Sequence, residues 1–399
     1  MITFAKAYDH VLAAQRHYGT EEVPLFRALG RVLAEPVYAD RDFPPFDRAT
    51  KDGIAIAFKG LQHGSQFRIV GVIAAGTAQG ALNNMECCLE IMTGAVLPKN
   101  ADTVVMYEDI SIENDSVILH NIPEKGANVH YQGSDTKKGS VVLEANSKIT
   151  AASIGVLASV GKASVLVKKV PKITLVSTGD ELVEVDQIPL PHQIRKSNVH
   201  SLFALLGHEG ITPNLRHMPD DKAVLRRELA DALRESDLLL LSGGVSKGKF
   251  DFIPEILSEL EVTKIFHGVL QKPGKPFWFG HHQASGKLIF SFPGNPVSTF
   301  VNYHVYFKDW LATSLGLAVP KGTVKLRESA KVSGSLTRFM GVKVQLEDGV
   351  LWAWPINENG SGDLTSLVWV DGFVRLSPKE ETYDKGSVVP FVPVIPSFK

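Results

Sequence analysis

The pattern of apolar and polar positions divides the chain into three regions, of which the first is residues 1–170. Residues 1–42 have the spacing of a helix, a turn and a second short helix. Beyond them, short β-like runs stand among many glycines at 67–73, 103–108 and 116–119. One helical stretch follows at 151–160. This pattern predicts an N-terminal region of two lobes, one helical or linking and one β-rich.

Strands and helices alternate in the second region, residues 171–316. Continuous apolar runs at 172–176, 237–241 and 288–292 are typical of buried strands. Helical spacing occurs at 197–206, 220–234 and 251–260, and again from 296 to about 311. Such alternation predicts a central α/β domain with a doubly wound parallel sheet.

Strands and turns return in the third region, residues 317–399. Runs that suit strands lie at 342–346, 350–354, 373–376 and 388–394. They predict a small C-terminal β-barrel. The expected fold is therefore a multidomain chain with α/β and β parts.

Composition changes this picture little. Lys and Arg total 42, Asp and Glu total 43, and the net charge of −1 gives no global field toward nucleic acid or an anionic membrane. No apolar stretch approaches the ~20 residues that span a bilayer. The N-terminus is charged and amphipathic, unlike a signal peptide. The two cysteines, Cys87 and Cys88, are adjacent and rarely reach disulfide geometry, so we expect a reducing cytoplasm.

Three polar loops rich in Gly or Pro each follow a predicted strand, at 178–181, 242–248 and 293–298. Ligands of open parallel sheets bind outside the carboxyl ends of the strands, so these loops are expected to share one rim. The candidate binding residues on them are Thr178, Asp180, Glu181, Ser242, Gly243, Gly244, Ser246, Asn295 and Ser298.

The middle loop fits two catalytic patterns incompletely. It has the GxxxxGK spacing of a P-loop, but Phe250 stands where a Ser or Thr is needed for Mg²⁺. It also has the GxSxG pattern of a serine hydrolase, although Ser246 lies several residues beyond the strand and no later His has a distinctive context. A glycine-rich turn that binds an anion through free N–H groups fits better. A hydrolase that uses Ser246 is the alternative.

Charged residues accompany the loops. Lys272 and Lys275 stand on a stiff turn, in which prolines fix φ and the intervening glycine lets a ligand approach. Asp221 and Asp251 are among several carboxylates beside the loops. Asp251 is either a helix N-cap or an oxygen ligand of Mg²⁺.

Seven stretches together resemble the MoeA / gephyrin E-domain family of molybdopterin molybdenumtransferases. They occur in family order, at 46–53, 91–106, 177–182, 242–251, 272–276, 293–298 and 360–362. The resemblance implies an elongated homodimer whose α/β domain is similar to MogA. It also implies an activity: molybdenum from molybdate enters adenylylated molybdopterin, AMP is released, and Mg²⁺ is required. Partners would be the molybdopterin adenylyltransferase and apo-molybdoenzymes.

The motif positions also imply residue roles. Asp251 and Asp221 would lie near Mg²⁺ and the nucleotide phosphate, and Glu181 in the pterin or nucleotide crevice. Asp52 and Thr93 would complete the partner subunit's site. The catalytic candidates are Asp52, Glu181 and Asp251. Molybdate is a tetrahedral dianion that needs cations and fixed donors. These would be Lys272, Lys275, Ser298 and Ser361.

Several positions depart from the family pattern. Gly341 stands where members often carry an Arg, to which the resemblance assigns a part in holding molybdate, and Arg338 and Lys343 are the candidate substitutes. Lys51, Lys196 and Lys249 stand where the family often has Met, Asp and an acidic residue. A non-catalytic pterin-binding scaffold is a further alternative, although the acidic and Lys motifs favour activity.

Overall fold

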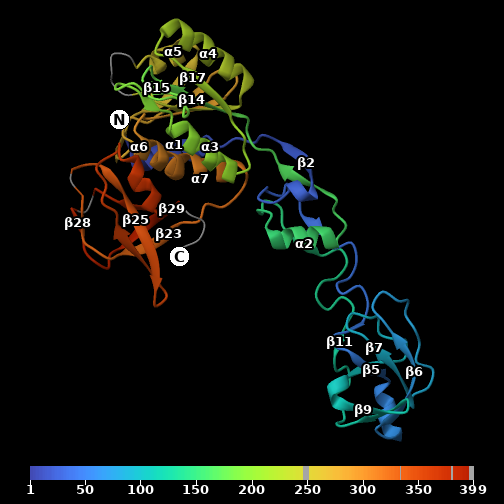
Figure 1. The fold of residues 1–399 in the computed structure, drawn as a ribbon. Coiled ribbons are helices and arrows are strands. Elements are labelled where there is room, and N and C mark those ends of the chain that lie inside the picture. Colours follow the sequence, from blue (N-terminus) through green and yellow to red (C-terminus); the bar gives the residue numbers. More distant parts are fainter. Residues whose placement is uncertain (246–250, 333, 379–380, 395–399) are drawn as a thin grey trace. The chain divides into compact units, whose positions relative to one another are not determined.

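The computed structural model describes residues 1–245, 251–332, 334–378 and 381–394 (Figure 1). These residues form two compact units. The first unit contains residues 1–22, 30–32 and 166–399, and the second contains residues 23–29 and 33–165.

A six-stranded sheet is the centre of the first unit, in the order β17-β14-β18-β22-β21-β19 (Figure 1). Four strands are parallel: β14 (Ile173–Thr178), β17 (Asn214–Met218), β18 (Leu238–Ser242) and β22 (Leu288–Phe292). β21 (Trp278–His282) runs antiparallel to both of its neighbours, β22 and the edge strand β19 (Val262–His267), whereas the sequence led us to expect a parallel sheet. The connections from β19 to β21 and from β21 to β22 are too short for a crossover helix, so these pairs are antiparallel.

Helices cover both faces of this sheet. One face packs against α1 (Phe4–Ala13), α3 (Asn198–His208), α6 (Pro296–Asn302), the π-helix η4 (Tyr303–Phe307) and α7 (Lys308–Ser314). The other packs against α4 (Lys222–Glu235) and α5 (Ile253–Glu259). Successive residues of β18 alternate between the two cores, Leu238 and Leu240 in one and Leu239 and Leu241 in the other. A strand buried on both faces explains the continuous apolar run.

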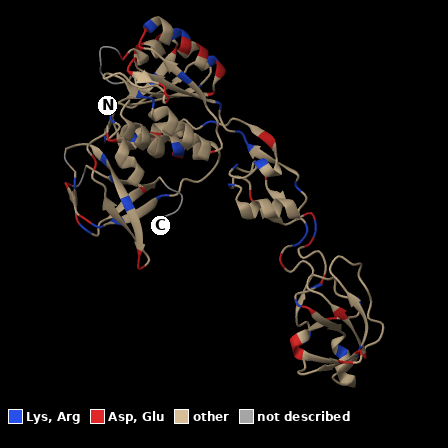
Figure 2. Ribbon diagram, in the orientation of Figure 1, with Lys and Arg blue, Asp and Glu red and all other residues tan. Residues whose placement is uncertain are grey.

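Charged residues of both signs are interleaved on α4, whereas the charged residues of α5 are acidic (Figure 2). Lys222 pairs with Glu255 at 2.9 Å and Arg226 with Glu259 at 3.5 Å. The polar faces of these helices are thus solvated, as their amphipathic spacing predicts.

The C-terminal strands close into a five-stranded barrel. Its order is β25-β26-β23-β29-β27, and β27 pairs again with β25. The strands are β23 (Gly322–Leu326), β25 (Thr337–Glu347), β26 (Val350–Pro355), β27 (Gly372–Leu376) and β29 (Val388–Pro393). β20 (Val269–Lys272) pairs with β25 in parallel and also with β1 (Ile2–Thr3), so the barrel sheet continues to the chain's start. Shorter elements of this unit are β15 (Leu182–Val183), β16 (Ile194–Arg195), β24 (Ala330–Lys331), β28 (Thr382–Tyr383) and η5 (Leu364–Trp369).

The second unit is built mainly of strands. Its six-stranded sheet has the order β8-β5-β7-β6-β10-β9. The strands are β5 (Gly53–Ile56), β6 (Gln66–Ile73), β7 (Cys87–Ile91), β8 (Thr103–Met106), β9 (Ile110–Glu113) and β10 (Ser116–Leu119). Two two-stranded sheets join β3 (Val37–Tyr38) to β12 (Val141–Leu143) and β4 (Arg48–Ala49) to β11 (Val129–His130). β2 (Thr20–Pro24) pairs with β13 (Ser164–Lys168), and the division between the two units falls within these two strands. Its α-helix is α2 (Ala151–Ser159), and η2 (Phe58–His63) and η3 (Tyr107–Asp109) are 3₁₀ turns.

The prediction of a second helix within residues 1–42 is wrong. The chain forms β2 there and a single 3₁₀ turn, η1 (Leu25–Arg27). Pro24 ends β2 and disfavours helical backbone in the residue before it, and Gly30 follows the turn with φ +78°. The helix at 151–160 is confirmed as α2, which begins at a Thr150 capping box.

Trp310 joins the first helix of the chain to the α/β core. Its side chain is fully buried, and its Nε1 donates to the Ala14 carbonyl at 3.1 Å. We expect Trp310→Ala to lower the free energy of unfolding by about 3–5 kcal/mol, because it leaves a large cavity. Urea unfolding followed by far-UV circular dichroism measures this loss. Trp369→Ala is the control, since Trp369 is 66% exposed, and an equal loss in both variants would contradict the expectation.

Candidate active site

A cavity of about 790 Å³ opens at the carboxyl ends of β14, β18 and β22. The loops that follow these three strands all line it, as the sequence led us to expect. The chain leaves β14 for β17 on one side of the sheet and returns to β18 on the other, so the cavity lies at the topological switch point. Its volume is in the range of small-molecule sites.

Two glycines bring the loop after β18 close to the loop after β14. Gly243 and Gly244 have φ of +104° and +70°. A Cβ on Gly243 would lie 2.9 Å from Thr178 Oγ1, and one on Gly244 would lie 2.5 Å from a side-chain carbon of Ile253. The Thr178 hydroxyl is buried and has no hydrogen-bond partner among the described residues. The cavity wall therefore offers an unsatisfied polar atom to a ligand.

Asn198 holds two of the loops together. Its Nδ2 donates to Ser242 Oγ at 2.9 Å and to the Gly294 carbonyl at 2.7 Å. A second bond of this kind, from Asn295 Nδ2 to Ser361 Oγ at 2.8 Å, connects the loop after β22 to the barrel. Our sequence analysis did not place Asn198 in the site. Ser242 and Asn295 thus help to shape the rim.

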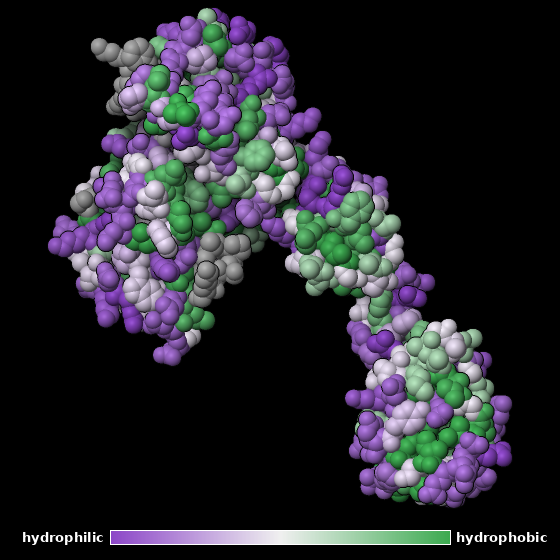
Figure 3. Space-filling model, viewed as in Figure 1, coloured by the Kyte–Doolittle hydropathy of each residue, from purple (hydrophilic) through white to green (hydrophobic). Residues whose placement is uncertain are grey.

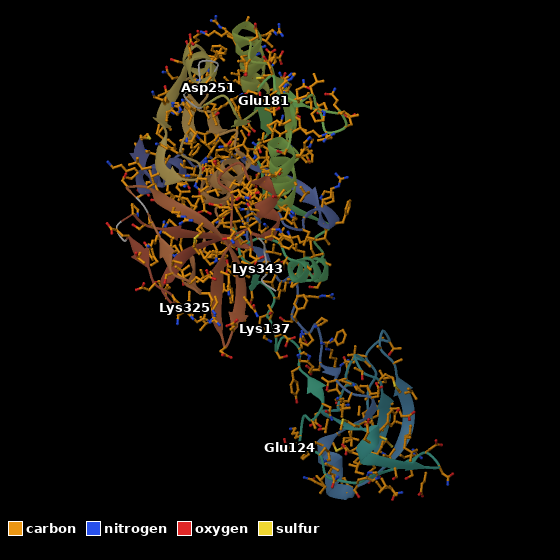
Figure 4. All side chains as sticks on the ribbon, turned by 60° about the vertical axis from the view of Figure 1, so that its left-hand side comes forward. Glu124, Lys137, Glu181, Asp251, Lys325 and Lys343 are labelled. Carbon is orange, nitrogen blue, oxygen red and sulfur yellow. The ribbon has the colours of Figure 1, made fainter. Side chains whose placement is uncertain are left out.

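Carboxylates gather on one side of the cavity. Glu181, Asp220 and Asp251 line it, and Asp180 Oδ1 accepts from the Asp220 backbone N–H at 3.1 Å. Glu181 and Asp251 are labelled on the α/β domain in Figure 4. Burial raises the pKa of Asp220, and the charges of Asp180, Glu181 and Asp251 raise it further. Such mutual repulsion favours a bound cation.

Asp221, expected beside Asp251 at Mg²⁺, has another role. Its Oδ1 accepts from the Val224 backbone N–H at 2.9 Å, which makes it the N-cap of α4. It does not line the cavity, whereas Asp220 does. Sequence reasoning left Asp220 out of the site, and only the direction of the two neighbouring side chains distinguishes them. Within the described residues, no three His, Cys, Asp or Glu side chains form a ready metal cluster.

A buried cation also lines the cavity. Lys196 is only 7% exposed and pairs with Glu184, whose pKa this hydrogen bond lowers. Arg195 is a further lining residue. The cavity lining thus contains both acidic and basic side chains.

A smaller pocket of about 260 Å³ adjoins the cavity, and both are lined by Pro276, Pro293 and Asn295. All four side chains expected to hold an oxyanion line it, namely Lys272, Lys275, Ser298 and Ser361. These residues come from three separate parts of the sequence. The fold therefore collects two cations and two hydroxyls around a space with room for a small anion.

Glu358 also lines this pocket, which sequence reasoning missed. Burial raises the pKa of Glu358, while Arg338 and Lys272 act in the opposite direction. Arg338 lies opposite Lys272 where β25 pairs with β20. Glu358 lies among cations in this pocket, so its ionisation changes the net charge of the pocket.

Comparison with known proteins identifies the chain's relatives. The MoeA N-terminal region (domain I and II) matches residues 2–161, a probable molybdopterin binding domain matches 174–313, and the MoeA C-terminal region (domain IV) matches 323–394. A molybdopterin molybdenumtransferase of Synechocystis sp. is 39% identical over 98% of this chain and 99% of its own length. The chain belongs to the MoeA family. It is thus a transferase of molybdenum cofactor biosynthesis, and its expected fold class is confirmed.

Other MoeA relatives agree. A molybdopterin molybdenumtransferase of Bacillus subtilis is 30% identical over 96% of this chain and 92% of its own. The crystal structure of a molybdopterin biosynthesis MoeA protein from Pyrococcus horikoshii OT3 superposes with a TM-score of 0.83, at 28% identity, over 98% of this chain and 100% of that one. No helix in the described part of the chain has the length and apolar character needed to cross a membrane.

One departure from the MoeA pattern, Gly341, can now be located. It is buried in β25, where a Cβ would lie 3.0 Å from Val370, and it does not line the 260 Å³ pocket. Neither of the two candidate substitutes lines that pocket: the Nη1 of Arg338 donates to the Lys331 carbonyl at 2.9 Å, and Lys343 is an exposed barrel residue (Figure 4). The charge of Arg338 does act on the pocket residue Glu358.

Two predicted MoeA site residues belong to the second unit and line neither cavity. Asp52 and Thr93 lie in the second unit, where Asp52 Oδ1 accepts from the Thr93 backbone N–H at 2.6 Å and from its hydroxyl at 2.8 Å. These bonds lower the pKa of Asp52, so its carboxylate is ionised and held in one orientation. Ser246 lies outside the described residues, as does Lys249.

Proposed function

We propose that this chain inserts molybdenum from molybdate into adenylylated molybdopterin and releases AMP. The proposal rests on one observation: the larger cavity and the smaller, cation-lined pocket adjoin each other and share lining residues. The 790 Å³ cavity has room for a pterin nucleotide, and the 260 Å³ pocket places cations and hydroxyls beside it. A tetrahedral dianion in the smaller pocket would lie next to the pterin end of a substrate in the larger one.

The residues of the larger cavity suit a phosphoanhydride. The Gly244 backbone and the Thr178 hydroxyl would donate to phosphate oxygens, whereas the Gly243 N–H already donates to the Phe292 carbonyl at 3.1 Å. Glu181 lies at the same rim, where it would orient the pterin or the nucleotide. Lys196 adds a cation to the lining, paired with Glu184.

The acidic side of the cavity suits Mg²⁺. This ion takes oxygen ligands, and one or two carboxylates together with substrate phosphates are enough to hold it. The carboxylates of Asp251 and Asp220 would supply these ligands, while Asp221 remains as the cap of α4. When bound, Mg²⁺ neutralises charge on the phosphates during their separation.

We propose a homodimer in the cytoplasm as the working form. The exposed apolar side chains Phe26 and Leu29, 81% and 63% accessible, lie in and just after η1, which contacts α2. Apolar surface is visible over α2 in Figure 3 and would be covered by a second copy. Asp52 and Thr93 would then complete the partner's site. A molybdopterin adenylyltransferase would supply the substrate, and apo-molybdoenzymes would accept the product.

An AMP-release assay tests the proposed function. Purified protein is mixed with adenylylated molybdopterin and Mg²⁺, with and without molybdate, and the product is offered to an apo-molybdoenzyme. We expect AMP release that depends on molybdate and reconstitution of the acceptor. Tight binding of the pterin nucleotide without release would instead identify a scaffold. Labelling of Ser246 by a fluorophosphonate would favour the hydrolase.

Glu358 should weaken molybdate binding when it is ionised. As the pH rises through its raised pKa, a negative charge appears in the pocket that Lys272 and Lys275 line, where the charges of Arg338 and Asp363 also act on it. We expect Glu358→Gln to lower the half-saturating molybdate concentration about threefold at neutral pH, since a like charge is removed. The difference should shrink at lower pH, where the side chain at position 358 is neutral in both proteins.

Molybdate titrations of AMP release at several pH values measure this effect. Glu347→Gln is the matched control, because Glu347 pairs with Arg327 at 3.2 Å and lines neither of the two spaces. Weaker molybdate binding by Glu358→Gln would show that Glu358 supports the anion rather than repelling it.

A further inference from the structure

Buried polar side chains hold the turn that carries Lys272 and Lys275 in place through hydrogen bonds. Gln271 Nε2 donates to the Pro273 carbonyl at 2.9 Å, and Asn302 Nδ2 donates to the Gly274 carbonyl at 3.4 Å. The Gly274 N–H donates to Ser298 Oγ at 3.2 Å. Both residues between the two lysines are therefore fixed by side chains.

These side chains belong to one network. Gln271 Nε2 also donates to Asn302 Oδ1 at 2.9 Å, and the Tyr306 hydroxyl donates to Gln271 Oε1. Gln271, Asn302 and Tyr306 are fully buried. Tyr306 lies in the π-helix η4, a wide turn of the kind often found at functional sites. Buried polar networks with satisfied partners hold one arrangement of the chain.

The turn lies directly on the two amide groups. Gly274 has φ of +87°, and a Cβ there would lie 2.4 Å from Asn302 Oδ1 and 2.7 Å from Gln271 Nε2. No space separates the Gly274 backbone from these amides. A change in the position of either amide must therefore move the turn and the lysines on it.

We propose that Gln271, Asn302 and Tyr306 are positioning residues for oxyanion binding. They fix the Lys272–Lys275 turn so that both ammonium groups, with Ser298, meet the anion in the 260 Å³ pocket. Donors that are already in place bind a tetrahedral dianion more tightly than donors that must be ordered on binding. This inference rests on the proposed function, with molybdate as the anion.

The first test is Tyr306→Phe, which removes one hydroxyl and keeps the ring. We expect the half-saturating molybdate concentration to rise about fivefold to tenfold, the size of one lost buried hydrogen bond. AMP release at saturating molybdate and the half-saturating concentration of adenylylated molybdopterin should change less than about twofold. Asn302→Ala removes the central amide and should raise the molybdate requirement further.

A matched control separates positioning from general loss of stability. The buried hydroxyls of Thr174 and Ser236 lie 2.5 Å apart, and Thr174 stands at the opposite end of β14 from the cavity. Thr174→Val removes that bond and should leave the molybdate requirement unchanged. Equal shifts in Thr174→Val and Tyr306→Phe, or an unchanged requirement in folded Tyr306→Phe and Asn302→Ala, would overturn the inference.

Calorimetric titration with molybdate alone separates this inference from the proposed function. If the wild-type protein binds molybdate but releases no AMP, the proposed function fails, and weaker binding by Tyr306→Phe still supports positioning. If the wild-type protein shows no saturable molybdate binding, the inference fails.

Discussion

Replacement of Asp251 by Asn should lower molybdate-dependent AMP release about 100-fold or more. Asp251 lines the larger cavity together with Glu181 and Asp220, and its charge is one of those that raise the pKa of Asp220. An amide keeps the shape of the carboxylate but loses the negative charge that Mg²⁺ requires. Removal of one electrostatic contact that acts on the reacting phosphates typically costs about two to three powers of ten in rate.

Single-turnover release of AMP at saturating Mg²⁺ measures this loss. Asp221→Asn is the control, because Asp221 caps α4 and Asn is an equally good N-cap. We expect its rate of AMP release to change less than about threefold. If Asp251→Asn retained full AMP release, Asp251 would have no part in the mechanism. If Asp221→Asn were the impaired variant, the metal would lie at Asp221, as the sequence motif suggests.

The contrast between these neighbours shows what the sequence can predict about the site. Polar loops after apolar strands can be assigned to one rim, because the carboxyl ends of parallel strands meet there. The choice between Asp220 and Asp221 depends on which side chain turns back to cap α4, and both have the same local pattern. Glu358 lines the 260 Å³ pocket because of how the barrel packs, and no local motif in the sequence indicates that packing.

The same limit applies to the fold. The runs at 172–176, 237–241 and 288–292 were predictable as strands, because burial on both faces removes polar residues from them. The first helix was predictable from its apolar stripe, which includes Phe4, but the surface that it packs on was not. That surface is formed by residues about 300 positions later, such as Trp310. Local spacing shows that a face will be buried but not what will cover it.

Replacement of Lys272 by Gln should raise the half-saturating molybdate concentration roughly 30-fold, because two cations share one dianion in the smaller pocket. The loss should exceed that of a simple contact, since Lys272 also offsets the charge of Glu358. Exposed Lys343 on the barrel supplies the control, and Lys343→Gln should leave the requirement unchanged (Figure 4). A normal molybdate requirement in Lys272→Gln would place the anion elsewhere.

The double variant of Lys272→Gln with Glu358→Gln should recover part of that loss. In the single variant, an ionised Glu358 faces the anion with one cation fewer beside it, so removing both charges takes away the repulsion as well as the attraction. We expect the two effects to be coupled by about 1 kcal/mol, within the range measured for residues in contact. Molybdate titrations of the four proteins form a double-mutant cycle, and strict additivity would mean that the two side chains act on the anion independently.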